Sequence, residues 1–342
     1  MTSQTQIDVA LDARLTRQMS VGMKAYAAEL TARLPRVAPD LHFENFSHGA
    51  NFSLDEQLAF PLRLARAKPR LTHFLSLYAP LLAPSPFVIT IHDLIHLRFP
   101  KFFKKRVGPY YQTVVRTICA RAARVLTDDE KTIDDLHELL GVSPAKVRVV
   151  ALGVDDVYLR EVEPERRERP YFLYVGNHRA HKDLPTLLHA WAALPEGLAA
   201  DLLLTGPDDV PPAWHLERRA GSLVFLGDIT TDRLARLYRG CTALVHSALR
   251  EGFGLPMLEA ATVGARVIAC ADAVPSVLQA DVDTFAPRDQ TMLTALMERA
   301  LLHPSPEHAG ALRAVARQLT WDRCARATAE VYREVLEENQ GR

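Results

Sequence analysis

Residues 251–260 read EGFGLPMLEA and are the most informative stretch of this chain. Pro256 suits the first turn of a helix, because the amide hydrogen that proline lacks has no partner there in any helix. We therefore expect Glu251 to end a loop and Glu259 to lie in the first turns of the helix that follows. Free N–H groups at a helix start attract anions, so the residues from Phe253 to Met257 are predicted to hold phosphate. A carboxylate on each side of an anion site fits a nucleotide sugar, which carries hydroxyls at both ends and phosphate between them.

The size and composition of the chain indicate a water-soluble protein of two domains. It has 342 residues, of which 48% are hydrophobic and 24% are charged, as in ordinary globular proteins. Lys plus Arg and Asp plus Glu are equal at 41 each, so no overall basic charge points to nucleic acid. The four cysteines are scattered, without the spacing of a zinc or redox site, and we expect reduced thiols in a cytoplasm. The N-terminus lacks the pattern of a signal peptide, and no apolar run approaches the roughly 18 residues of a membrane span.

Apolar segments that alternate with helical patterns predict an α/β fold with parallel sheets. The expected strands are residues 6–11, 87–91, 123–127, 147–154, 171–176, 201–206, 222–227, 242–247 and 265–270. A polar, charged stretch from Val154 to Pro170 interrupts the pattern and is the best linker candidate. We expect two Rossmann-like domains that face each other across a cleft, residues 1–160 and 161–320, followed by a C-terminal helix in 321–342 that packs toward the first domain.

The loops after the strands are where ligands gather in open α/β sheets. Such loops are expected to begin at Ala13, His92, Gly176, Gly206, Gly227 and Ala248. Lys182 lies in the loop that begins at Gly176, and Asp183 is expected to cap the helix that follows.

Four segments resemble retaining glycosyltransferases of family 4, which have the two-domain GT-B fold, and in particular their bacterial polysaccharide-type members. They are residues 89–100 (ITIHDLIHLRFP), 174–194 (YVGNHRAHKDLPTLLHAWAAL), 224–269, which include the EGFG turn, and 321–336 (WDRCARATAEVYREVL). The resemblance covers most of the chain and is densest after Tyr171.

The resemblance also implies roles for individual residues. Glu251, His92 and Lys182 are the expected catalytic residues: Glu251 contacts hydroxyls of the donor sugar, His92 approaches the donor sugar or the reacting centre, and Lys182 binds the diphosphate. The expected donor- and nucleotide-binding residues are Glu259 for the ribose, Arg179, Gly22, Phe253, Gly254, Leu255 and Gly227. Arg179 or His181 would assist Lys182.

Each of these residues also has a plainer interpretation. Glu259 could merely complement a helix dipole, and Glu251 could be a solvated acid in a loop. Lys182 could be an exposed cation beside a helix start, and His92 could cap a strand end. His178 and His181 form an HxxH pattern that suggests a metal, but no third ligand follows at a recognisable spacing.

The predicted function is the transfer of a hexosyl group, with mannosyl favoured, from a nucleotide-diphosphate sugar to a glycan, a lipid-linked or a small-molecule acceptor. No metal and no cofactor are expected beyond the nucleotide sugar as co-substrate. Residues 99–111 (FPKFFKKRVGPYY) interleave aromatic and basic side chains, which fits either a membrane surface or a helix start with its aromatics in the core. We expect a cytoplasmic protein, with a peripheral position at the inner face of the membrane if that contact forms. The alternative function is an inactive sugar-nucleotide-binding partner of another transferase.

Overall fold

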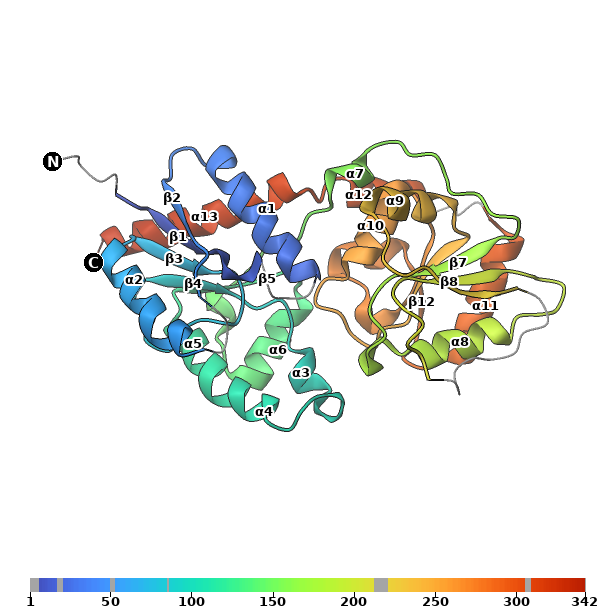
Figure 1. Cartoon of the computed structure of the whole chain (residues 1–342), viewed down its shortest axis with the longest axis horizontal. Coiled ribbons are helices and arrows are strands. Elements are labelled where there is room, and N and C mark those ends of the chain that lie inside the picture. Colours follow the sequence, from blue (N-terminus) through green and yellow to red (C-terminus); the bar gives the residue numbers. More distant parts are fainter. Residues whose placement is uncertain are drawn as a thin grey trace. The chain divides into compact units, whose positions relative to one another are not determined.

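The computed structural model describes residues 6–16, 21–49, 53–84, 86–211, 221–304 and 309–341. The chain divides into two compact units, Met1–Gly153 with Thr320–Arg342, and Val154–Leu319 (Figure 1). Each unit contains a six-stranded sheet in which all strand pairs are parallel. The predicted α/β fold with parallel sheets is confirmed.

The first unit is built on the strand order β2-β1-β3-β4-β5-β6. Its strands are β1 (Val9–Asp12), β2 (Phe43–Phe46), β3 (Leu71–Phe74), β4 (Phe87–Thr90), β5 (Arg124–Thr127) and β6 (Val147–Val149). Its α-helices are α1 (Val21–Val37), α2 (Phe60–Ala67), α3 (Ile95–Arg98), α4 (Val107–Tyr110), α5 (Arg116–Arg121), α6 (Lys131–Leu140) and α13 (Trp321–Gln340). Shorter helical turns are η1 (Ala13–Thr16), η2 (Asp55–Ala59), η3 (Pro100–Phe102), η4 (Tyr111–Val115) and η5 (Pro144–Lys146).

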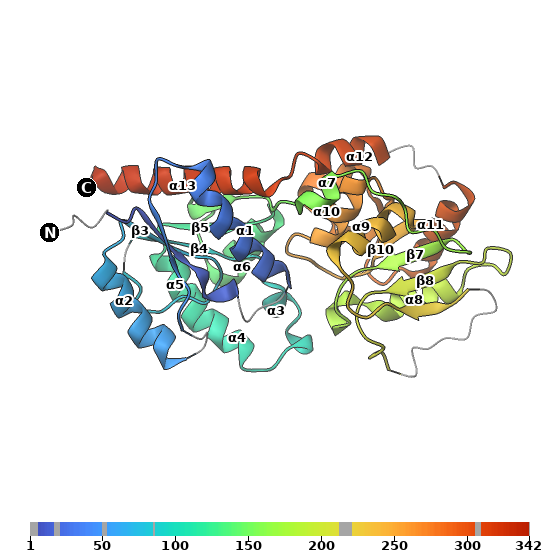
Figure 2. The same cartoon turned by 45° about the horizontal axis from the view of Figure 1, so that its top comes forward.

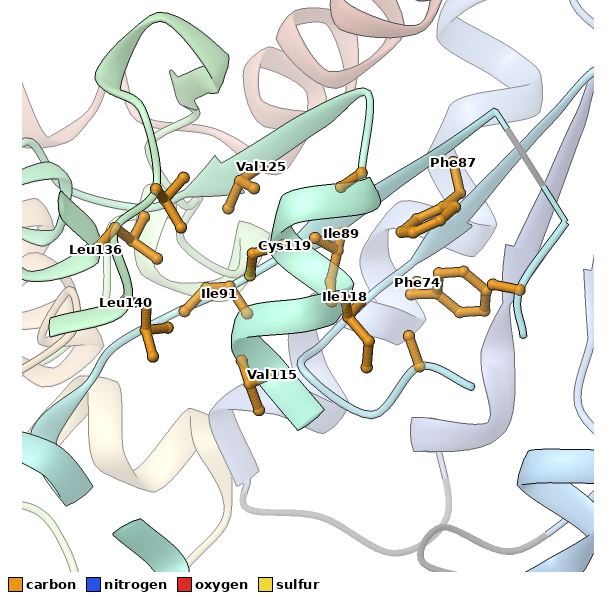
Figure 3. Packing of buried hydrophobic residues seen from close by; sticks show 14 of the residues in the cluster. Phe74, Phe87, Ile89, Ile91, Val115, Ile118, Cys119, Val125, Leu136 and Leu140 are labelled. Atoms are coloured by element: carbon orange, nitrogen blue, oxygen red, sulfur yellow. The ribbon is translucent and has the colours of Figure 1, made fainter. Parts of the chain in front are cut away.

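Helices cover both faces of the first sheet, which explains why its strands β1, β3 and β4 are buried along their whole length. Helices α1 and α13 lie on one face, and α2 and α5 lie on the other (Figure 2). On the second face, Phe74, Phe87 and Ile89 of the strands pack with Ile118 of α5 and Leu136 of α6 (Figure 3). The rings of Phe74 and Phe87 meet edge to face, with centroids 5.5 Å apart.

The C-terminal helix α13 belongs to the first unit, although it follows the second in the sequence. The chain passes so close to Gly153 that an added Cβ would lie 2.1 Å from the backbone nitrogen of Trp321, so only glycine fits there. Farther along α13, the hydroxyl of Tyr332 is hydrogen-bonded to Nδ1 of His73 on β3 at 2.6 Å. Burial lowers the pKa of His73 to about 3, so this imidazole is neutral and the pair is a buried hydrogen bond between uncharged groups.

The second unit has the strand order β12-β11-β10-β7-β8-β9. Its strands are β7 (Tyr171–Tyr174), β8 (Asp201–Leu204), β9 (Leu223–Phe225), β10 (Ala243–His246), β11 (Val267–Cys270) and β12 (Asp283–Phe285). Its α-helices are α7 (Asp156–Leu159), α8 (Leu184–Ala192), α9 (Thr231–Gly240), α10 (Leu255–Val263), α11 (Gln290–Leu302) and α12 (Ala309–Ala316). Shorter turns are η6 (Ala180–Lys182), η8 (Ala271–Ala273) and η9 (Ser276–Asp281). Counted from β7, this is the Rossmann order, in which the winding reverses between the neighbouring central strands β7 and β10.

The segment from Val154 to Pro170 is not a free linker, because its residues fold onto the second unit. Asp155 caps α7 by accepting a hydrogen bond from the Val157 amide at 2.9 Å, and Val157 and Tyr158 are buried. Farther along, Glu165 pairs with Arg233 of α9 at 3.0 Å. The first unit therefore ends at Gly153, before the boundary at residue 160 that the sequence suggests.

Some elements carry no clear pattern in the sequence. Strands β2 (FENF), β3 (LTHF) and β12 (DTF) mix polar with apolar residues, so no continuous apolar segment marks them in the sequence. The helical segment from Val107 to Arg121 contains the π-helical turn η4 between α4 and α5.

Candidate active site

The residues with the strongest chemical signal meet where the winding of the second sheet reverses. Lys182 lies at the end of η6, in the loop after β7, and Glu251 lies in the loop after β10. These strands are neighbours in the sheet, so their carboxyl ends bring the two loops together. Ligands of open α/β sheets bind at this position.

Glu251 is held by two basic side chains. Its Oε1 accepts a hydrogen bond from the Lys182 ammonium and another from Nε2 of His246, the latter at 2.7 Å. The side chains of Lys182 and Glu251 are each only 12% exposed. Burial by itself would raise the pKa of Glu251, but the Lys182 charge and the His246 contact hold it well below its usual value. The carboxylate is therefore anionic, and both of these contacts use the same oxygen, Oε1.

His246 is a site residue that the sequence analysis misses. It is the last residue of β10, and its side chain is 1% exposed. With Nε2 directed to Glu251, its buried Nδ1 has no hydrogen-bond partner among the described residues. The rule that selects His92, a histidine at the end of an apolar strand, would also have selected His246.

The predicted phosphate turn forms at the start of α10. Gly254 has the left-handed φ of 80° and precedes the helix, and a Cβ there would lie 2.3 Å from the methyl group of Met257. Phe253 is buried and anchors the turn. Within the described parts of the chain, the N–H groups of Gly254 and Leu255 have no acceptor.

One part of that expectation is wrong. The Met257 amide is not free, because it donates to the Gly254 carbonyl at 2.9 Å within the first turn of the helix. Pro256 has no amide hydrogen, so only the N–H groups of residues 253–255 remain available to phosphate at this turn.

Glu259 lies on α10, as predicted, and its carboxylate contacts a tyrosine. The hydroxyl of Tyr238 donates to Oε2 of Glu259 at 2.9 Å. Burial raises the pKa of Glu259 to about 7, and the negative charge of Asp155 adds to the rise, whereas hydrogen bonds from Tyr238 and Tyr158 oppose it. This acid therefore changes charge near neutral pH.

The remaining predicted residues of the second unit occupy the neighbouring loops. Arg179 is exposed, and its guanidinium has no side-chain partner in the described ranges. Gly227 has a left-handed φ of 64° and exchanges backbone hydrogen bonds of 3.0 and 3.1 Å with Gly206. Asp183 is the N-cap residue of α8, as predicted, but its carboxylate accepts from the Thr186 hydroxyl at 2.7 Å and not from a backbone amide.

The HxxH pattern does not come together as a metal site. His178 bonds to Asp209 and, through Nε2, to the Thr205 carbonyl at 2.9 Å, whereas His181 is buried on η6. Across the described residues, no three His, Cys, Asp or Glu side chains are grouped to hold a metal ion.

In the first unit, His92 follows β4 and pairs with a residue that the sequence does not single out. Its Nδ1 lies 2.7 Å from Oδ2 of Asp128, which directly follows β5. Burial would lower the pKa of His92, but the Asp128 carboxylate raises it above the ordinary value. The ring of Tyr26 packs edge-on against the imidazole, with centroids 4.7 Å apart. Nε2 of His92 is buried and has no partner among the described residues, so the pair presents one unused imidazole nitrogen.

Two further predicted features lie in the first unit. Gly22 is the second residue of α1, whereas the loop before it, residues 17–20, falls outside the described residues. In the segment 99–111, the cations Lys101, Lys104, Lys105 and Arg106 are exposed. Tyr111 is buried in the core beneath them, so the aromatic side chains of this segment point partly inward.

Comparison with known proteins identifies the family. A family model described as Glycosyltransferase Family 4 matches residues 22–158, and one described as Glycosyl transferases group 1 matches residues 169–303. The chain is a family 4 glycosyltransferase. The O-antigen chain mannosyltransferase B of Escherichia coli is 26% identical over 269 residues, which cover 72% of this chain and 70% of that protein. The matches of this chain to other curated mannosyltransferases cover between 17% and 50% of the length of those proteins.

Solved structures share the fold of this glycosyltransferase. The sucrose-phosphate synthase of Thermosynechococcus elongatus aligns with a TM-score of 0.74 at 19% identity, over 97% of this chain and all of that one. The Anabaena protein Alr3699/HepE, solved in complex with UDP and glucose, aligns with a TM-score of 0.69 at 16% identity, over 95% of this chain and 99% of that one. The predicted GT-B fold is thereby confirmed. Among the described residues, no helix is long and apolar enough to cross a membrane.

Proposed function

We propose that this glycosyltransferase is a retaining, metal-independent enzyme that transfers a hexosyl group from a nucleotide-diphosphate sugar to an acceptor hydroxyl. The observation that carries the proposal is the pairing of Lys182 with Glu251 at the switch point of the second sheet, beside the turn at Gly254. These residues supply a cation and free N–H groups for phosphate, and an anion for sugar hydroxyls.

Lys182 is proposed to bind the diphosphate. An ammonium group has three N–H donors, and Glu251 accepts one of them, so two remain for phosphate oxygens. The N–H groups of Gly254 and Leu255 lie at the positive end of α10 and would bind the same oxygens. Arg179, which has no side-chain partner among the described residues, is proposed as the second cation. Positive groups there stabilise the charge that develops on the leaving diphosphate.

Glu251 is proposed to bind hydroxyls of the donor sugar. Since Lys182 and His246 both contact Oε1, Oε2 is available to accept hydrogen bonds from a hydroxyl. A carboxylate that is anionic at every working pH gives charge-assisted bonds, which are stronger than neutral ones. Glu259, on the far side of the turn, is proposed to accept hydrogen bonds from the ribose.

The acceptor would attack from the face that the leaving diphosphate occupies, and a diphosphate oxygen would take the proton of the acceptor hydroxyl. The new glycosidic bond and the broken sugar–phosphate bond then involve the same face, so the anomeric configuration is retained. His92, with its unused Nε2, is proposed as the catalytic contribution of the first unit.

Mannose is the favoured sugar, because the curated relatives named above are mannosyltransferases. The acceptor is proposed to be a glycan or a lipid-linked sugar, and the latter would place the enzyme at the cytoplasmic face of the membrane.

Glu251→Gln tests the proposal, because it keeps the size of the side chain and removes its charge. We expect transfer to fall roughly ten- to a hundredfold, as for the loss of a charge-assisted hydrogen bond, with nucleotide affinity nearly unchanged. Thermal shifts with GDP, UDP, ADP and dTDP identify the base, and NMR of the product identifies its anomeric configuration. Full transfer by Glu251→Gln contradicts the assignment, and nucleotide binding without any transfer by the wild type supports the inactive-partner alternative.

A further inference from the structure

An apolar stripe with a cationic rim lies on the surface of the first unit, whereas the proposed donor site lies in the second unit. Leu54, Leu58 and Leu62 are 79%, 58% and 56% exposed, and they follow one another at intervals of four along the continuous helix formed by η2 and α2. Residues at this spacing share one face of a helix. The opposite face of the same helix is buried through Phe60 and Leu64, so the core does not account for the exposed leucines.

A neighbouring loop extends the stripe. The Leu81 amide donates to the Gln57 side chain at 3.0 Å, which places the loop of residues 79–84 beside Leu58. Leu82 in that loop is 72% exposed. Arg121 fixes the loop through the carbonyls of Leu81 and Ala83, the latter at 2.8 Å. We call Leu54, Leu58, Leu62, Leu81 and Leu82 the leucine surface.

Uncompensated positive charge surrounds the leucine surface. Arg66, Lys68 and Arg121 have no carboxylate partner among the described residues. The acids of the same helix are already neutralised: Asp55 pairs with Arg63 at 2.9 Å, and the buried Glu56 pairs with Arg14. Outside these ion pairs, the charged side chains of this helix and its C-cap are the exposed cations Arg66 and Lys68.

We propose that the leucine surface docks onto an anionic lipid bilayer, with the leucines inserted into the headgroup region and the cations against the lipid phosphates. An amphipathic helix with leucines on one side and arginines beside them is suited to lie in the plane of a membrane. A second copy of the chain fits less well, because a symmetric contact would oppose the same cations. The proposal deepens the proposed lipid-linked acceptor: docking would bring the enzyme to the membrane that holds such an acceptor.

Flotation of the whole protein with vesicles tests this. We expect binding to vesicles that contain phosphatidylglycerol and much weaker binding to pure phosphatidylcholine. The triple variant Leu54→Ser, Leu58→Ser, Leu62→Ser should lower the partition coefficient by roughly fivefold per leucine, or about a hundredfold in all. The double variant Arg66→Gln, Lys68→Gln should lower it by roughly fivefold per charge on the anionic vesicles alone.

The matched control changes exposed apolar side chains elsewhere, with Met292→Ser and Leu302→Ser on α11, and should bind vesicles as the wild type does. Absence of vesicle binding by the wild type, or equal binding by the triple variant, overturns the proposal. A thermal shift with nucleotide and transfer to a water-soluble acceptor should not change in the triple variant. A failure of docking is thereby distinguishable from a failure of the proposed transferase function.

Discussion

Replacement of Glu259 by glutamine should remove a pH-dependent loss of stability. The folded chain keeps the Glu259 proton up to a pKa of about 7, whereas the unfolded chain releases it near the ordinary value of 4.5. Between these values the folded state binds more protons, so the free energy of unfolding falls as the pH rises. Stability from this group is therefore present below about pH 4.5 and is lost by about pH 7.

The size of the effect follows from the two pKa values. At about 1.4 kcal/mol per pKa unit, a rise from 4.5 to about 7 corresponds to about 3 kcal/mol. Glu259 is partly exposed, so solvent screens part of its charge. We therefore expect a measured difference of about 2 kcal/mol in the free energy of unfolding. Glutamine can still accept the hydrogen bond from Tyr238 but carries no charge.

Urea unfolding of the wild type and of Glu259→Gln at about pH 5 and about pH 8.5 measures this difference. The two proteins should be similar in stability at the lower pH, and the variant should be the more stable one at the higher pH. Glu298→Gln, on the surface of α11 in the same unit, is the control and should follow the wild type. The reasoning is refuted if Glu259→Gln retains the full pH dependence of the wild type.

The same titration bears on nucleotide binding. If ionised Glu259 accepts hydrogen bonds from the ribose, affinity should fall about tenfold for each pH unit below about 7. Isothermal titration calorimetry with the preferred nucleoside diphosphate measures this slope. In Glu259→Gln the affinity should be weaker and should lack this slope, so that only the ionisation of the ligand's own phosphate changes the affinity with pH.

Four further outcomes are expected. Lys182→Met should weaken nucleoside diphosphate binding by about 2 kcal/mol without affecting a nucleoside that lacks phosphate, and an unchanged dissociation constant would refute its phosphate role. His246→Phe should lower kcat while nucleotide affinity holds, since it removes one of the two side chains that fix Glu251; a wild-type kcat would show that the contact does not matter. Asp128→Asn should lower the pKa of His92, measured by NMR, and thereby reduce the stability that the protonated imidazole provides at low pH; an unmoved pKa contradicts the pairing. EDTA should leave transfer unchanged, and a loss restored by a divalent ion would reopen the question of metal.

The sequence predicts most of the proposed donor site because its signals are local. Pro256 and Gly254 fix a turn and a helix start by their own backbone preferences, and these place Glu251 and Glu259 on either side of the turn. The same local reasoning fails for Met257, whose amide donates within the first turn of the helix. It also fails for the stretch after Val154, whose charged residues indicate a linker although two side chains of α7 are buried.

The partners of these residues could not be predicted, because they come from distant parts of the chain. Lys182 and Glu251 are 69 positions apart, and His92 and Asp128 are 36 apart. Each pair meets only because its two strands are neighbours in a sheet, which the order of strands along the sequence does not reveal.

The sequence by itself determined the α/β class, the residues of the EGFG turn and the glycosyltransferase family, since each depends on short stretches with a fixed chemistry. The tertiary structure decided that His246 joins Lys182 on Glu251, that Asp128 pairs with His92, and that α13 returns to the first unit. The physical reason is that hydrogen bonds across a parallel sheet link residues by strand order, whereas turns and helix starts link them by their spacing along the chain.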